Sequence, residues 1–183
     1  MKDTIVCNLY GGPGTGKSTT AAGVFSELKL SDINAELVTE YAKDKVWEGS
    51  HSILEYQIYV FGKQLLRIQR LLGKVDVIVT DSPLLLSVVY GKKESQEFQD
   101  LVISEYNKMN NLDVYLLRGK KYNESGRLQT ENQARILDGT IKLLLDMYAP
   151  EYRRVVADRA AIQHVSALIL NQFNEADSDE VRG

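Results

Sequence analysis

Residues 11 to 18 read GGPGTGKS, so Gly11, Gly16, Lys17 and Ser18 complete the pattern G-x-x-x-x-G-K-[ST]. The apolar run IVCNLY precedes this pattern, and an amphipathic sequence follows it. Glycines let the backbone curl so that consecutive N–H groups and a helix N-terminus point at phosphate oxygens, while the lysine adds a positive charge. A turn that merely joins a strand to a helix is the alternative. The order of strand, loop and helix favours a phosphate-binding loop (P-loop).

This loop defines the candidate nucleotide site. The hydroxyl of Ser18 is the side chain that such a loop offers to Mg²⁺, and Lys17 is its catalytic cation. The candidate nucleotide-binding residues are Gly11, Gly12, Pro13, Gly14, Thr15, Gly16, Lys17, Ser18 and Thr19.

The bulk composition indicates one soluble domain. A chain of 183 residues buries roughly 70% of its unfolded surface around a single core, so we expect one domain over residues 1–170. The net charge of −3 gives no general attraction to nucleic acid but leaves a local basic patch open. Cys7 is the single cysteine, so neither a disulfide nor a cysteine-based metal site is predicted. The acidic end, residues 171–183, lacks periodicity, and we expect it to be disordered.

Targeting and metal-binding signals are missing from the sequence. No stretch approaches the roughly 18 apolar residues of a membrane span, and the N-terminus leaves no room for a signal peptide, so we expect a cytoplasmic protein. Neither His51 nor His164 has partners at metal-ligand spacing, and we interpret both as structural or surface residues.

Short apolar runs alternate with segments of helical periodicity, which is typical of a parallel sheet whose strands are joined by helices. The predicted strands are 4–10, 35–39, 75–80, 112–117 and 154–157, and the predicted helices are 17–30, 50–72, 94–110, 130–147 and 160–170. This pattern predicts an α/β fold of the P-loop NTPase type. We expect a three-layer sandwich with a five-stranded parallel sheet, helices on both faces, and ligands at the carboxyl ends of the strands.

The second predicted helix, residues 50–72, has two distinct faces. Apolar residues recur at steps of three and four, which predicts a buried face made of Leu54, Ile58, Phe61, Leu65, Ile68 and Leu72. A basic stripe follows the same spacing on roughly the opposite side and consists of Lys63, Arg67, Arg70 and Lys74. This stripe is either a solvated helix face or a docking surface for a polyanion.

A carboxylate follows the third predicted strand. Phosphoryl transfer requires a metal ion, neutralising cations and a group that orients the attacking oxygen. In VDVIVTDSP, Asp81 stands just past the strand, where it can reach Mg²⁺ or accept a proton from an acceptor hydroxyl. Asp81 is therefore the first catalytic candidate and, with Ser18, a candidate Mg²⁺ ligand. A helix cap involving Ser82 is the structural alternative.

A second carboxylate, Glu40, ends the second predicted strand, and Tyr41 and Trp47 follow it. Glu40 can bind a hydroxyl or a base edge, and a ring can stack on a base, a contact worth on the order of 1–3 kcal/mol. These three are the candidate acceptor-binding residues. Glu40 is also a catalytic candidate, because it and Asp81 could reach the same acceptor oxygen. Alternatively the two rings fill the core and Glu40 caps a helix.

A basic segment follows the fourth predicted strand. Residues 118–127 read RGKKYNESGR and combine four cations with one acid and two glycines. This composition predicts a lid over about residues 118–130. Arg118 and Arg127 could close over the triphosphate and stabilise the transition state, a role worth roughly 10³-fold or more in rate. A solvated basic loop is the alternative.

Four segments follow successive predicted strands: GGPGTGKST, VTEYAKD, VIVTDSP and LLRGKKYNESGRLQTENQA. Together they resemble the small P-loop kinases of the nucleoside and nucleotide kinase group, over the chain up to about Leu170. The set is similar to the branch that includes nicotinamide riboside kinase domains and several phage-encoded kinases. Within that branch the chain resembles most the phage 5-hydroxymethyluracil DNA kinases, which phosphorylate a base hydroxymethyl group within DNA.

The resemblance implies ATP and Mg²⁺ as cofactors, residues 118–127 as the lid, and an adenine contact near Asp158, after the last strand. It also implies that Glu40 is the acceptor-side carboxylate and Asp81 the metal-side one. One departure matters. The Asp-Arg pair that often follows the third strand in thymidylate kinases is Asp81-Ser82 here, so no arginine contact to an acceptor monophosphate is visible. This favours a hydroxyl of nucleoside type, free or within a polymer.

The resulting hypothesis is a phosphotransferase that moves the γ-phosphate of ATP to an alcohol group of a nucleoside-type acceptor. Its sharper version has 5-hydroxymethyluracil in duplex phage DNA as the acceptor and the host cytoplasm as the location. The first alternative is a kinase of a free nucleoside or nucleoside monophosphate.

The second alternative is an ATPase or switch without an acceptor. A GTPase is disfavoured because residues 107–110 read NKMN and lack the acid of the Asn-Lys-x-Asp signature. A ring ATPase is disfavoured because we find no room for a second, helical domain and no acid after Asp81. The presence of Lys17, Ser18 and Asp81 together disfavours a protein that binds a nucleotide without chemistry.

Overall fold

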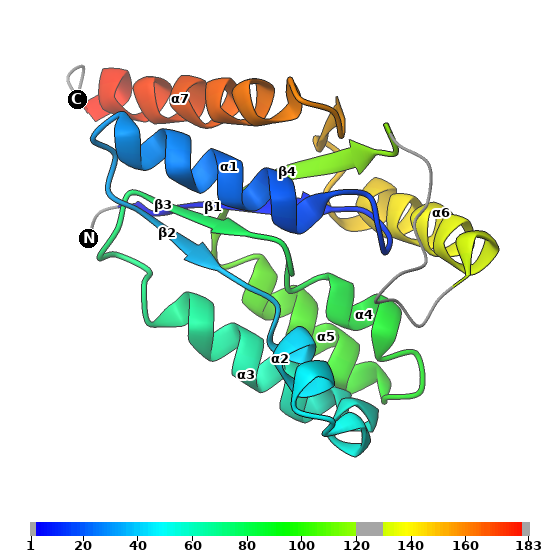
Figure 1. Ribbon diagram of the computed structural model, residues 1–183. Coiled ribbons are helices and arrows are strands. Elements are labelled where there is room, and N and C mark those ends of the chain that lie inside the picture. Colours follow the sequence, from blue (N-terminus) through cyan, green and yellow to red (C-terminus); the bar gives the residue numbers. More distant parts are fainter. Residues whose placement is uncertain (1–2, 120–129, 181–183) are drawn as a thin grey trace.

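Five parallel strands form one sheet between two layers of helices (Figure 1). The computed structural model describes residues 3–119 and 130–180, with side chains up to Phe173. The strands are β1 (Ile5–Tyr10), β2 (Ala35–Val38), β3 (Val77–Thr80), β4 (Asn110–Leu117) and β5 (Arg153–Val156). Their order across the sheet is β2-β3-β1-β4-β5, and every neighbouring pair is parallel. The predicted α/β fold with a five-stranded parallel sheet is confirmed.

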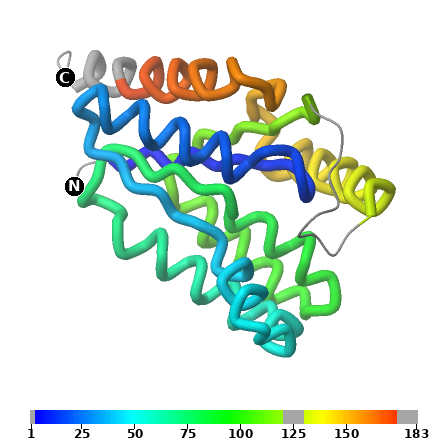
Figure 2. Tube along the Cα trace, viewed as in Figure 1, coloured from blue at the N-terminus to red at the C-terminus, as the bar shows by residue number. Residues whose placement is uncertain are grey.

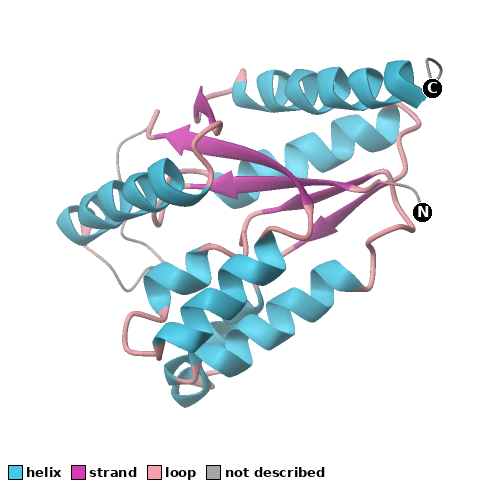
Figure 3. Ribbon diagram, turned by 180° about the vertical axis from the view of Figure 1, so that it is seen from behind, coloured by secondary structure: helices cyan, strands magenta, loops and turns pink. Residues whose placement is uncertain are grey.

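Helices cover both faces of the sheet (Figure 1, Figure 3). One layer consists of α1 (Lys17–Leu30) and α7 (Ala161–Glu180). The other layer consists of α3 (Gln57–Gln69), α4 (Leu86–Tyr90), α5 (Gln96–Tyr106) and α6 (Glu131–Tyr148). The short helix α2 (Tyr41–Trp47) and the 3₁₀ helix η1 (His51–Glu55) connect β2 to α3. Neither α2 nor α4 was predicted, because seven and five residues are too few to show a helical period.

The central strand, β1, is buried on both faces and is apolar except for Asn8, whose side chain bonds to Asn111 and Asp113. Ile5, Cys7 and Leu9 pack with α1 and α7, whereas Val6 and Tyr10 pack with the opposite layer. A nearly continuous apolar run is expected of a parallel strand between two helical layers. It fixes β1 at the middle of the sheet, which in turn places the P-loop at the middle of one edge.

The register of β1 with β3 positions the functional edge. Asn8 pairs with Thr80, the last residue of β3, and β1 continues for two more residues in the same direction. Gly11 and Asp81 therefore leave the sheet at the same edge. Because the chain crosses from β1 to β2 on one side and reaches β4 on the other, a ligand crevice is expected at this point.

The pattern of residues 51–73 was interpreted only in part correctly. Phe61 and Ile68 are buried as predicted, but Ile58, in the first turn of α3, is 59% exposed. Gln64 is buried instead. Its side chain accepts a hydrogen bond from the N–H of Tyr41 at 2.9 Å and donates one to the carbonyl of Thr39 at 3.4 Å. A polar residue thus joins α3 to the end of β2.

The closing helix is longer than predicted. It was expected to end near Leu170 before a disordered tail, whereas α7 continues to Glu180. The sequence between these points contains no glycine or proline to stop a helix, and Phe173 packs on the core. The first part of α7 lies beside α1 (Figure 2), where a Cβ on Gly23 would come within 2.3 Å of Ile162. Neither α7 nor any other helix in the described part of the chain is long and apolar enough to cross a membrane.

The core around α6 gives a stability prediction. Leu145 is fully buried against the sheet, whereas Leu143 on the same helix is 67% exposed. We expect Leu145→Ala to lower the free energy of unfolding by about 2–5 kcal/mol, because it leaves a cavity. Leu143→Ala is the matched control and should change it by less than about 1 kcal/mol. Urea denaturation measures both, and equal losses would contradict the layer assignment.

Candidate nucleotide and acceptor site

The P-loop has the backbone geometry of an anion cradle. Gly11, Gly14 and Gly16 adopt φ of 146°, 77° and 103°, conformations that L side chains rarely adopt. The loop is tied internally by Thr15, whose hydroxyl donates to the carbonyl of Gly12 at 3.0 Å. Helix α1 then begins at Lys17 with no side-chain cap and no acid in its first turn. Its first N–H groups are thus left for an anionic ligand.

The ammonium of Lys17 lies over the loop. Its Nζ donates to the carbonyl oxygens of Gly11 at 2.7 Å and Gly12 at 3.3 Å. Burial lowers the pKa of Lys17, while the negative charges of Glu40, Asp81 and Asp138 oppose that change. These three carboxylates therefore act on the lysine from three different elements. The sequence predicted Glu40 and Asp81 as site residues but not Asp138.

Asp81 fits a role at a metal ion. It is 4% exposed, and its Oδ1 has no hydrogen-bond partner among the described residues. The N–H of Ser82 donates to Thr80 Oγ1 at 3.1 Å. The side chain that caps this loop is therefore Thr80, not Asp81. A buried, unsatisfied carboxylate oxygen near a phosphate loop suits Mg²⁺ or one of its waters.

The other candidate ligand, Ser18, is exposed in the first turn of α1. The described residues contain no cluster of three or more His, Cys, Asp or Glu side chains that could hold a metal alone. Mg²⁺ bound by one or two side chains together with substrate phosphates requires no such cluster. The residues present therefore fit a nucleotide-bound Mg²⁺, which Ser18 and Asp81 would help to bind.

Glu40 stands at the N-terminal end of α2 but makes no capping hydrogen bond there. Burial raises the pKa of Glu40, and the charge of Lys17 lowers it in part. Glu40 and Asp81 also repel each other, which adds to the increase in the pKa of Glu40. The two carboxylates and Lys17 are thus within electrostatic reach of one another.

Tyr90 at the end of α4 is a further residue of this region. Partial burial and the charges of Glu40 and Asp138 raise the pKa of the Tyr90 phenol to about 12. Sequence reasoning missed it, because α4 itself was not predicted and nothing local distinguishes this tyrosine. The residue is 43% exposed, so Tyr90 lies at the surface.

The two aromatic candidates occupy different environments. Tyr41 is buried, with Arg67 Cζ 5.2 Å and Lys45 Nζ 5.4 Å from its ring centroid, and its hydroxyl donates to the hydroxyl of Tyr59. Trp47 is 80% exposed at the other end of α2, about 10 Å along the helix from Glu40. Tyr41 therefore packs between α2 and α3. Stacking of either ring on a base remains a prediction.

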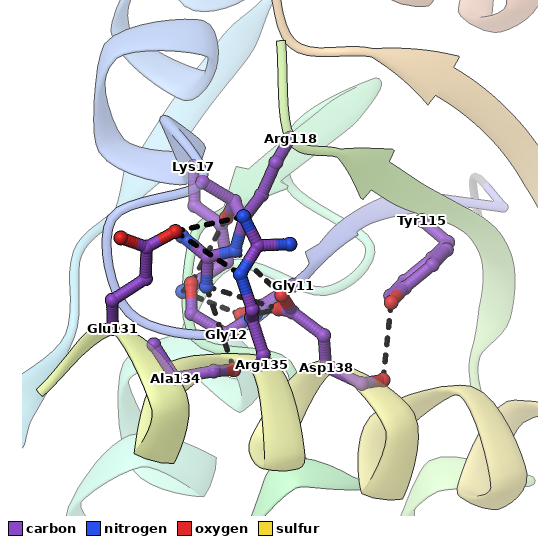
Figure 4. Close-up of polar contacts among 10 residues, drawn as sticks. Gly11, Gly12, Lys17, Tyr115, Arg118, Glu131, Ala134, Arg135 and Asp138 are labelled. Atoms are coloured by element: carbon purple, nitrogen blue, oxygen red, sulfur yellow. Dashed lines mark hydrogen bonds and ion pairs between the residues drawn. The ribbon is translucent and has the colours of Figure 1, made fainter. Parts of the chain in front are cut away.

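Arg118 is held at the P-loop by an ion pair. It is the first residue after β4, and its guanidinium pairs with the carboxylate of Asp138 on α6 (Figure 4). The same carboxylate accepts a hydrogen bond from the N–H of Gly12 at 2.7 Å. Residues 120–129 of the predicted lid, with the candidate Arg127, lie outside the described residues.

The loop after β5 borders the P-loop and the start of the predicted lid. A Cβ on Gly16 would lie 3.7 Å from Ala157 Cβ, and one on Gly119 would lie 2.8 Å from the carbonyl oxygen of Ala157. Asp158 is exposed and accepts a hydrogen bond from the N–H of Ala160 at 2.8 Å. This position is compatible with the adenine contact expected near Asp158, which stays a prediction.

Comparison with known proteins places these features in context. Residues 6–164 match a protein family described as an AAA domain. No curated protein matches the sequence.

Two solved structures share the fold. A crystal structure of NadR protein in complex with NR superposes with a TM-score of 0.66 at 16% sequence identity, over 93% of this chain and 51% of that one. The chain thus spans about half the length of that protein. A structure of deoxyadenosine kinase from M. mycoides with bound dATP superposes with a TM-score of 0.51 at 18% identity, over 92% and 99% of the two chains.

The raised pKa of Glu40 gives a pH-dependent stability prediction. The pKa of Glu40 in the folded protein lies above its usual value of 4.5. The protonated carboxyl therefore adds stability below pH 4.5, and this contribution is lost as the pH rises through the folded pKa. Glu40→Gln removes the ionisation. We therefore expect the variant to melt at a higher temperature than the wild type at about pH 8. The difference should shrink as the pH falls toward 4.5.

Thermal unfolding followed by circular dichroism at several pH values measures this difference. Glu36→Gln, an exposed position on β2, is the matched control. A Glu40→Gln variant that is less stable than the wild type at alkaline pH would contradict the geometry described.

Proposed function

The chain belongs to the AAA domain family, and from this premise we propose that it is an ATP-dependent kinase acting on a hydroxyl of a nucleoside-type acceptor. The convergence of Lys17, Glu40 and Asp81 at the carboxyl ends of three neighbouring strands carries the proposal. A phosphate cradle, a cation and two carboxylates are the groups that phosphoryl transfer requires.

In this proposal the P-loop, Gly11 to Thr19, binds the triphosphate of ATP, and Ser18 and Asp81 hold Mg²⁺, which neutralises charge on the phosphates. Glu40 orients the acceptor hydroxyl and accepts its proton. The acceptor oxygen forms a bond to the γ-phosphorus while the bond from phosphorus to the β–γ bridging oxygen breaks, and ADP leaves with that oxygen. The raised pKa of Glu40 suits a group that must take up a proton.

The class of acceptor is supported by the two solved structures of similar fold. One contains NR and the other is a deoxyadenosine kinase with dATP, so both bind compounds of the nucleoside class or its phosphates. The serine after Asp81, in place of arginine, supports an acceptor without a monophosphate.

The more specific proposal is that the acceptor is the hydroxymethyl group of 5-hydroxymethyluracil within duplex phage DNA. It is supported by the sequence resemblance and by part of the basic stripe. Lys63 and Arg70 are exposed on and beside α3, whereas Arg67 bonds to the carbonyl of Thr39 at 3.0 Å and pairs with Asp44. Lys74 is exposed as well, so three of the four cations are accessible to a polyanion. A free nucleoside remains the alternative acceptor.

An ATPase without an acceptor is a second candidate, because the family description is that of an AAA domain. The two candidates differ in one observable. A kinase forms ADP faster when its acceptor is added, whereas an ATPase releases inorganic phosphate at a rate that no nucleoside or DNA changes.

The catalytic assignments predict the effect of two substitutions. Lys17→Ala and Asp81→Asn should each lower acceptor-dependent ADP formation by about 10²-fold or more, because each removes a charge aimed at the transferred phosphate or its metal. A coupled ADP assay measures the rates, and circular dichroism checks folding. Lys29→Ala, exposed on the last turn of α1, is the control and should retain activity. Unchanged turnover in either folded site variant would remove that role.

A DNA acceptor predicts a steep salt dependence. Each phosphate neutralised contributes a slope of about −0.9 to the logarithm of affinity against the logarithm of salt concentration. We expect kcat/KM for duplex DNA to fall steeply with added salt, and Lys63→Ala or Arg70→Ala to reduce the slope by about one each. A free thymidine acceptor, assayed in parallel, should respond weakly. If kcat/KM for DNA does not change with salt, DNA is excluded as the acceptor. A kinase of a free nucleoside would still be possible.

A further inference from the structure

Asp138 joins two separate parts of the phosphate site (Figure 4). Its Oδ1 accepts the N–H of Gly12 at 2.7 Å and the Nη2 of Arg118 at 3.2 Å, while its Oδ2 accepts the Nε of Arg118 at 2.6 Å. The arginine thus uses two nitrogens against two oxygens, a fork that fixes the plane of the guanidinium. One carboxylate on α6 therefore orients both the first turn of the P-loop and the first residue after β4.

This contact is enclosed. The side chains of Arg118 and Asp138 are 11% and 18% exposed. On the same helix, by contrast, Lys142 and Asp146 form a pair with exposures of 43% and 39%. Exposed pairs of that kind restrict their side chains little, whereas an enclosed two-bond pair holds one geometry. The backbone is fixed as well, since the hydroxyl of Tyr115 donates to the carbonyl of Asp138 at 3.0 Å.

The P-loop is shaped to receive α6. A Cβ on Gly12 would lie 2.4 Å from Asp138 Oδ1, 2.8 Å from the carbonyl oxygen of Ala134 and 3.1 Å from Arg118 Nη2. Glycine at position 12 therefore serves the close approach of the helix and the guanidinium. Arg118 consequently lies against the loop that cradles phosphates.

The charges of this pair act on Lys17. Asp138 raises the pKa of the lysine, and Arg118 lowers it, so both lie within electrostatic reach of the ammonium. Two cations, Lys17 and Arg118, thus lie beside the P-loop, and the negative charge of Asp138 offsets their mutual repulsion. Such an arrangement is in place before a phosphate arrives and needs little reorganisation when it does.

We propose that Asp138 is a positioning residue that holds the Arg118 guanidinium beside the P-loop, where it contacts the terminal phosphate of ATP. Asp138 itself touches no phosphate and acts through the arginine. The inference rests on the proposed function, in which the P-loop binds ATP, and it adds how the protein distinguishes ATP from ADP. An arginine placed at the terminal phosphate favours the triphosphate over the diphosphate.

Calorimetric titration of Mg-ATP and Mg-ADP tests this without any acceptor. The proteins are the wild type, Asp138→Asn, Arg118→Ala and the double variant, with Asp146→Asn as the matched control on α6. We expect the wild type and the control to bind ATP more tightly than ADP by about tenfold or more, as for hydrogen bonds to charged groups. Asp138→Asn and Arg118→Ala should each lose most of this preference, and the double variant should lose no more than either.

Three results would overturn the proposal. They are a folded Asp138→Asn protein that keeps the wild-type preference, losses that multiply in the double variant, and a wild type that binds ATP and ADP equally. If Asp138→Asn does not fold, Arg118→Lys replaces it, since lysine keeps the charge but cannot form the fork. Arg118→Lys should then lose the preference, and its retention would overturn the proposal. A wild type that prefers ATP but phosphorylates nothing would contradict the proposed kinase alone.

Discussion

The pairing of β1 with β3 is the interaction on which the site depends. Its register, Asn8 opposite Thr80, brings the P-loop and Asp81 out of the sheet at the same edge. A slip of one residue would turn every side chain of β1 to the other helical layer, and both layers are packed against it. Burial on two faces therefore specifies the register, and the register places a carboxylate beside a phosphate loop. The chemistry of the site follows from a packing constraint.

The buried charges of Lys17 and Glu40 at this edge of the sheet lower the stability of the fold. Burial lowers the pKa of Lys17 and raises that of Glu40, so both groups would be better solvated in the unfolded chain. Their mutual attraction offsets part of this cost. A bound triphosphate would add negative charge beside Lys17, and Mg²⁺ would add positive charge beside Asp81. Functional sites commonly retain such strain, because the groups must be free to act on a substrate.

Local patterns were enough to predict the sheet, the P-loop and the shared location of Glu40 and Asp81. Apolar runs and glycine spacing are read within a few residues, and parallel strands bring their carboxyl ends to one edge. The contacts of Asp138 were not predictable in this way, since 126 positions separate it from Gly12. The exposure of Ile58 and the burial of Tyr41 also depend on where α3 begins and on what Gln64 and Arg67 contact. These features arise from tertiary packing, which a single sequence does not display.

The most direct test of the account is the transfer of labelled γ-phosphate from ATP to three acceptors side by side. The first acceptor is thymidine with nicotinamide riboside, the second is a mixture of deoxynucleoside monophosphates, and the third is duplex DNA containing 5-hydroxymethyluracil. The account predicts label on an acceptor hydroxyl, and label within the DNA that resists an end-specific phosphatase would identify the polymer as substrate. Label found only in inorganic phosphate in every reaction would contradict the central claim that this site is a kinase.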